Sequence, residues 1–121
     1  MDITLAQREY EFAQIIWAHE PLSSTELVKL CENNLGWKKS TTYTVLKKLC
    51  AKGLFQNKES IITSCISQSY VQQQMSQTFI SQTFQNSLPS FLNAFMNDKT
   101  LDEHEIDELT SLIERYRKDD K

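Results

Sequence analysis

Six lysines and no acidic residue lie within residues 33–58 of a 121-residue chain that carries 16 Asp+Glu against 13 Lys+Arg. Amines gathered in one segment of an otherwise acidic protein favour a localised contact with a polyanion, because a scattered excess would not focus the field. Charge alone leaves a second interpretation open, a lysine face that is merely solvated. The lysines are Lys38, Lys39, Lys47, Lys48, Lys52 and Lys58.

Hydroxyl groups and a phenol lie among these lysines at helical spacing. One apolar stripe in residues 40–52 predicts an amphipathic helix, and it consists of Val45, Leu46, Leu49 and Cys50. The opposite face then presents Ser40, Tyr43, Thr44, Lys47 and Ala51. Hydroxyls suit contacts with base edges and amines suit phosphates. We therefore predict that the six lysines contact phosphates and that the bases are contacted by Ser40, Thr41, Tyr43 and Thr44.

Two of these base-contacting residues have a competing interpretation. The Tyr43 ring could pack against the turn that precedes the helix, and the Thr41 hydroxyl could cap the first helical turn. Trp17 and Trp37 stand at the end of an apolar stripe and just before the lysine-rich helix, so we predict packing for both rather than ligand stacking.

Residues for catalysis or metal binding do not cluster in the sequence. His19 and His104 are single and far apart, and neither lies beside a carboxylate cluster of the kind that acid–base or metal chemistry needs. The acids around His104 belong to a helix N-terminal turn, where they oppose the helix dipole favourably. Cys31, Cys50 and Cys65 form no C-x-C or C-x-x-C pair, so neither a disulfide nor a zinc site is indicated. There is no Gly-rich phosphate loop. We expect no enzyme activity, no metal and no cofactor.

Capping boxes and periodicity predict the elements that position the lysine-rich segment. Thr4 with Gln7 predicts a helix over 4–19, and Ser23 with Glu26 predicts one over 24–33. The lysine-rich helix over 40–52 follows, ended by Gly53. Residues 54–56 and 61–66 are β-prone and predict a hairpin. Three helices and a two-stranded ribbon are the order of a winged helix-turn-helix domain, which we place at residues 1–68.

Residues 60–97 contain no Asp, Glu, Lys or Arg, and glutamines crowd their middle. A disordered Gln/Ser-rich tract is one interpretation. Apolar residues at helical intervals favour helices over 68–86 and 89–97, and Thr100 with Glu103 predicts a last helix to about Arg117, with a frayed tail over 117–121. The fold class is mainly α (α+β), with a C-terminal helical dimerisation domain at residues 69–121.

Wide apolar faces on the C-terminal helices need a cover, and the same segment of a second copy supplies one. We therefore predict a two-fold homodimer with intertwined C-terminal helices. Its interface residues are Phe79, Phe84, Phe91, Leu92, Phe95, Ile106, Leu109, Leu112 and Ile113. No apolar stretch approaches a membrane span, and no secretory signal opens the chain, so a cytoplasmic location without membrane insertion is expected.

Several segments carry a family resemblance. They are Ile15-Ile16-Trp17, the stretch from Ser23 to Cys31, Trp37 followed by residues 41–53 (TTYTVLKKLCAKG), residues 91–95 (FLNAF) and residues 101–109 (LDEHEIDEL). They resemble the BlaI/MecI/CopY family of bacterial winged-helix repressors. The resemblance implies a dimer on a palindromic operator in double-stranded DNA, and repression of β-lactam resistance or copper-handling genes. It also implies that Ser40, Thr41, Tyr43 and Thr44 occupy the base-contacting positions.

The copper branch of that family carries a C-terminal Cys-x-Cys pair, which this chain lacks, so the penicillinase-repressor branch is the more similar. In that branch a membrane sensor-protease that responds to β-lactam leads to cleavage of the repressor before the Phe of an Asn-Phe pair. The similar segment here is Asn93-Ala94-Phe95. The resemblance implies cleavage at Ala94–Phe95, or at Asn93–Ala94 one residue earlier.

The sequence thus predicts a dimeric, operator-specific repressor that is released by proteolysis in its dimerisation domain. A winged-helix module used only for protein–protein assembly is the first alternative, suggested by the acidic total charge. A regulator that responds to metals or oxidants through its thiols is the second.

Overall fold

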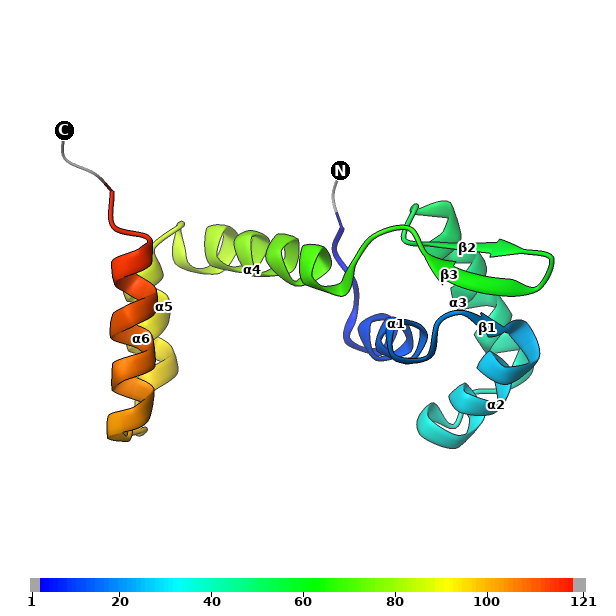
Figure 1. The fold of residues 1–121 in the computed structure, drawn as a ribbon, viewed down its shortest axis with the longest axis horizontal. Coiled ribbons are helices and arrows are strands. Elements are labelled where there is room, and N and C mark those ends of the chain that lie inside the picture. The colour runs from blue at the N-terminus through cyan, green and yellow to red at the C-terminus, as the bar shows by residue number, and fades with distance from the viewer. Residues whose placement is uncertain (1–2, 119–121) are drawn as a thin grey trace.

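The computed structural model describes residues 3–118, which form six helices and a small three-stranded sheet (Figure 1). The N-terminal elements are α1 (Gln7–His19), β1 (Leu22–Ser23), α2 (Ser24–Leu35), α3 (Lys39–Ala51), β2 (Phe55–Lys58) and β3 (Ile61–Ser64). The C-terminal helices are α4 (Gln68–Phe84), α5 (Leu88–Met96) and α6 (Glu103–Arg115). This arrangement confirms the predicted fold class, a winged helix followed by a helical region.

One of the three predicted capping boxes is present. Ser23 accepts a hydrogen bond from the Glu26 N–H, and the Glu26 carboxylate accepts one from the Ser23 N–H. The boxes predicted at Thr4 and Thr100 are wrong, because α1 begins after Ala6 and α6 begins after Asp102. Ile3 and Leu5 are buried in the core, which holds residues 3–6 outside the helix, and the Asp102 carboxylate accepts from the Glu105 N–H at 2.8 Å.

The sheet has the strand order β1-β3-β2, with both pairings antiparallel. The hairpin of β2 and β3 confirms the predicted ribbon, and its turn residues Glu59 and Ser60 both adopt positive φ values. Strand β1 was not predicted: it has two residues and pairs Leu22 with Ile62. This pairing fastens the hairpin to the start of α2, where the Ser24 N–H donates to the Ser60 carbonyl at 2.9 Å.

One hydrophobic core lies between α1, α2, α3 and the sheet. Both tryptophans belong to its packing, as predicted. The Trp37 ring stacks on Phe12 at 5.5 Å, and the Trp17 ring lies 5.6 Å from that of Phe55. The buried apolar residues are Ile3, Leu5, Phe12, Ala13, Ile16, Leu22, Leu27, Cys31, Leu46, Leu49, Leu54, Phe55, Ile62 and Val71.

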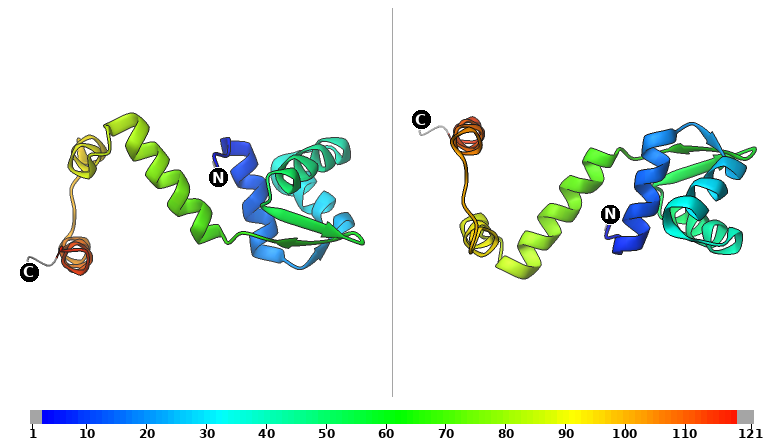
Figure 2. Two further views of the ribbon diagram at one scale, coloured as in Figure 1. Left: turned by 90° about the horizontal axis from the view of Figure 1, so that it is seen from above. Right: turned by 90° about the horizontal axis from the view of Figure 1, so that it is seen from below.

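The uncharged segment after the hairpin is helical, so the disordered alternative is wrong. Helix α4 leads away from the winged-helix unit, and α5 and α6 lie at its far end (Figure 2). Val71 on α4 still belongs to the N-terminal core, with Met75 packed against it. Arg117 and Lys118 follow the last helix, and the remainder of the predicted frayed tail lies outside the described residues.

Candidate nucleic-acid interface

Helix α3 is held against the core by a turn that the sequence specifies closely. Gly36 ends α2 with a φ of 67°, a left-handed conformation that glycine adopts at little cost, and its N–H donates to the Glu32 carbonyl. Trp37 follows and is fixed by its stacking on Phe12. The chain therefore re-enters a helix at Lys39 with a defined direction.

The buried face of α3 consists of Thr42, Leu46 and Leu49. Leu46 and Leu49 were predicted, whereas Val45 and Cys50 are only partly buried. Thr42 was missed, although it lies four residues before Leu46 and seven before Leu49 on the same face. Its hydroxyl donates to the Lys38 carbonyl at 3.2 Å, which satisfies the polar group within the core.

The predicted base-contacting residues all lie on the exposed face of α3. Ser40, Thr41 and Thr44 are exposed, and Tyr43 is 36% exposed. The helix cap is Lys38 with no side-chain bond, which removes Thr41 capping as an explanation for that residue. Tyr43 extends beside Lys39, whose amine lies 6.0 Å from the ring centre, rather than being buried in the preceding turn. Thr44 donates to the Ser40 carbonyl at 2.9 Å, so its methyl group and its hydroxyl lone pairs remain available.

The six lysines of the segment fall into two groups. Lys39 and Lys47 are exposed on α3, Lys38 is exposed at its N-cap, and Lys58 is exposed at the end of β2. The amines of Lys48 and Lys52 instead contact α1 and the residues that precede it. The Lys48 amine forms an ion pair of 2.6 Å with Glu9 on α1, and the Lys52 amine donates to the Thr4 carbonyl at 3.4 Å.

The Glu9–Lys48 pair fastens α3 to α1. The Lys48 ammonium and the Ala6 N–H both donate to the Glu9 carboxylate, and they lower its pKa below the ordinary value of 4.5. Sequence spacing gave no signal of this pair, since the partners are on different helices. The electrostatic consequence is that the Lys48 charge is paired with a carboxylate, whereas Lys52 donates to a neutral carbonyl and keeps its charge.

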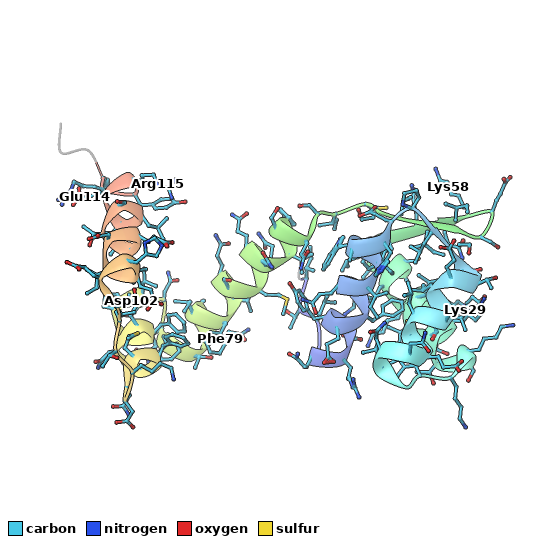
Figure 3. All side chains as sticks on the ribbon, turned by 60° about the horizontal axis from the view of Figure 1, so that its bottom comes forward. Lys29, Lys58, Phe79, Asp102, Glu114 and Arg115 are labelled. Carbon is cyan, nitrogen blue, oxygen red and sulfur yellow. The ribbon has the colours of Figure 1, made fainter. Side chains whose placement is uncertain are left out.

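The winged-helix unit and the C-terminal helices lie at opposite ends of the molecule. Lys29 and Lys58 mark the first end, and Asp102 and Glu114 mark the second (Figure 3). The surface that carries the lysines of α3 is therefore separate from the acidic first turn of α6.

The apolar side chains of α5 and α6 are largely uncovered. Neither helix has a buried residue. Ile106 and Ile113 on α6 are 47% and 58% exposed, and Tyr116 at its C-cap is 80% exposed. With Leu109 they recur at spacings of three and four, the pattern by which one helix packs along another. A groove of about 820 Å³ also separates α5 from α6, with Phe91, Leu92, Phe95, Leu109 and Leu112 among its lining residues.

An aromatic cluster joins α4 to α5. The Phe79, Phe84 and Phe91 rings pack edge to face at 5.5 to 6.1 Å, and Phe95 stacks on Phe91 at 5.8 Å. Phe79 and Phe95 nevertheless remain 49% and 54% exposed. The Ala94–Phe95 bond lies inside α5, and both residues are exposed.

Thiol and histidine side chains do not assemble into a site. Cys31 is buried and Cys65 exposed, with Cys50 between these extremes, and all three are free thiols. Among residues 3–118 there is no group of three His, Cys, Asp or Glu side chains able to hold a metal ion. Nor does any helix in the described part of the chain have the length and apolar character to cross a membrane.

Comparison with known proteins matches residues 5–115 to the family model described as Penicillinase repressor. The Penicillinase repressor of Bacillus licheniformis is 26% identical over 117 residues, which cover 93% of this chain and 91% of that protein. The methicillin resistance regulatory protein MecI of Staphylococcus aureus (strain Mu50 / ATCC 700699) is 23% identical over 115 residues, covering 92% and 94%. MecI of Mammaliicoccus sciuri is 22% identical over a stretch of the same length.

Proposed function

The chain belongs to the penicillinase repressor family, and we propose that it represses transcription as a homodimer bound to a palindromic operator, with β-lactam resistance genes as its targets. The family consists of repressors rather than enzymes, in agreement with the prediction that the chain has no enzyme activity. The observation that carries the proposal is the exposed face of α3, where hydroxyls, a phenol and free lysine amines lie together.

In this proposal α3 enters the major groove of each half-site. Ser40, Thr41, Tyr43 and Thr44 contact base edges, because a helix fits that groove and its outward side chains reach the donors and acceptors there. The phosphates are contacted by Lys38, Lys39, Lys47 and Lys58. Lys48 and Lys52 act less directly, since Glu9 and the Thr4 carbonyl already hold their amines.

The second copy covers the apolar faces of α5 and α6. The groove between these helices has a volume of about 820 Å³ and can therefore admit side chains from a partner helix, which supports an intertwined dimer. Two half-site domains that are joined in this way bind together, because occupation of one half-site raises the effective concentration at the other.

The same arrangement supports release by proteolysis. We propose the Ala94–Phe95 bond, or Asn93–Ala94 beside it, as the site cut after a membrane sensor-protease responds to β-lactam. Cleavage at either bond leaves Phe79, Phe84 and Phe91 on one fragment and Phe95 with α6 on the other, and the shared apolar core of the dimer is lost. Since both bonds lie in α5, that helix must unwind locally before a protease can bind it as an extended strand.

Selection of bound sequences from a random duplex pool tests operator binding most directly. The proposal expects a recovered motif with two-fold symmetry, and a motif without symmetry contradicts the dimer. Four phosphate contacts per protomer predict that the logarithm of affinity falls against the logarithm of salt concentration with a slope of about −7 for the dimer. Binding that is absent, or that is insensitive to salt, favours a protein-assembly module instead.

Lys47→Ala isolates one phosphate contact in this experiment. The substitution should weaken binding to all sequences similarly and reduce the salt slope by about 2 for the dimer, because one contact is lost in each protomer. Lys118→Ala, which removes an equal charge beyond α6, serves as the control and should leave the slope unchanged.

A further inference from the structure

Helix α4 packs against the winged-helix core at one end and contributes to the aromatic cluster at the other. Its first half supplies the fully buried Val71 to the winged-helix core, with Met75 packed against that core. Its second half supplies Phe79 and Phe84 to the aromatic cluster. No glycine, proline or charged residue interrupts it between these two attachments. The direction of α4 therefore determines where the C-terminal helices lie relative to α3.

Aromatic residues on α1 fix the start of α4. The Trp17 indole N–H donates to the Ile66 carbonyl at 3.0 Å, which holds the chain just before the helix, and Ser67 caps the helix by accepting from the Tyr70 N–H. The Tyr10 ring packs edge-on against Trp17 at 6.0 Å. These contacts place the first turn of α4 on the outer surface of α1.

The Tyr10 hydroxyl makes the contact that orients α4. It accepts hydrogen bonds from the Gln68 and Gln72 side-chain amides, at 3.2 and 3.1 Å. Residues four apart lie one above the other on a helix, so a single oxygen engages two successive turns on one side of α4. Val71 fastens the same stretch into the core between them. A hydroxyl bound to one turn would leave the helix free to tilt, whereas bonds to two turns oppose both tilt and rotation.

We infer that α4, held by Tyr10, Gln68 and Gln72, is a rigid spacer that sets the separation of operator half-sites which the dimer accepts. This inference rests on the proposed function. A helix of 17 residues is about 25 Å long, so a tilt of about 10° at its first turn displaces its far end by about 4 Å. In a two-fold dimer the displacement occurs on both sides, and the two α3 helices move relative to each other.

The affinity of such a dimer depends strongly on the number of base pairs between the two half-sites. Adding or removing two base pairs moves one half-site by about 7 Å along the duplex and rotates it by about 70°. A rigid dimer cannot follow both changes and loses simultaneous engagement of the two half-sites. A dimer with a loosened α4 adapts more readily, and its affinity depends less on the spacing.

Tyr10→Phe tests the orienting hydroxyl because it keeps the ring contact with Trp17 and removes only the acceptor. Affinities are measured by fluorescence anisotropy on the selected operator and on duplexes with spacers two base pairs longer and shorter. The wild-type protein should lose about 100-fold in affinity on the altered spacers, and Tyr10→Phe only about tenfold. Tyr70→Phe is the matched control: Tyr70 is on α4, is 44% exposed, and its substitution should leave the wild-type ratio unchanged.

A second variant tests the rigid helix itself. The double substitution Ser76→Gly with Gln77→Gly lies between the two attachments of α4, at exposed positions, and should reduce the spacing penalty below that of Tyr10→Phe. If Tyr10→Phe loses as much affinity on the altered spacers as the wild-type protein does, the orienting role of the Tyr10 hydroxyl is refuted. If the double glycine variant also loses as much, the role of α4 as a rigid spacer is refuted. If wild-type protein binds no symmetric operator at all, the proposed function fails instead, so the two failures are distinguishable.

Discussion

Ile113→Asp tests the dimer without disturbing the protomer. Ile113 is 58% exposed on α6 in the single chain, so an aspartate there removes little internal packing. Full burial of an isoleucine side chain contributes about 1.5 to 3 kcal/mol, so covering its exposed part contributes about 1 kcal/mol, and twice that in a two-fold dimer. An unpaired carboxylate at an apolar interface adds a penalty, which brings the total to about 5 kcal/mol. The dimer dissociation constant should rise by about 10³ to 10⁴-fold.

Sedimentation equilibrium measures this change, and circular dichroism checks that helix content is unaltered. Gln73→Asp is the control, since it adds the same charge at an exposed position on the half of α4 that packs on the winged-helix unit. The control should remain dimeric at concentrations where Ile113→Asp is monomeric. A variant that still sediments as a dimer at low micromolar concentration would show that this face of α6 is not the interface.

The winged-helix unit gives three further tests. Thr44→Ala should change base preference at one operator position by about 1 to 3 kcal/mol, measured by competition among single-base variants; equal loss on all of them would contradict base contact. The Glu9 pKa is lowered by Lys48 and by the Ala6 N–H, so the ion pair stabilises the fold above pH 4.5 and this stabilisation is lost as pH falls through the lowered pKa. The stability deficit of Glu9→Gln in urea unfolding should therefore shrink from pH 6 toward about pH 3; a constant deficit would contradict the pair. Peptide mapping after alkylation should find Cys65 modified first and Cys31 last, because Cys31 is fully buried and burial raises its pKa to about 11.

Local signals in the sequence were sufficient to predict the elements that present the interface. Leu46 and Leu49 indicated the buried side of α3, and Gly53 indicated where that helix ends. The outward position of Ser40, Tyr43 and Thr44 then followed from helical geometry alone. Their exposure confirms the orientation of the face, while their contacts with bases stay a prediction.

Long-range contacts account for what the sequence did not predict. The spacing of Thr4 and Gln7 matches a capping box, yet burial of Ile3 and Leu5 keeps that segment extended. Strand β1 has too few residues for a pattern and exists because β3 offers it a partner. The pairing of Lys48 with Glu9 depends on how α1 crosses α3, which no local spacing reveals.

The uncovered faces of α5 and α6 have a consequence for gene dosage. No residue on either helix is buried in one protomer. In the proposed dimer, association covers them, and operator occupancy below the dimer dissociation constant would vary with the square of the amount of repressor. Halving the supply of the protein would then cut the bound fraction about fourfold. A promoter under this control would therefore respond to modest loss of repressor with a sharp threshold.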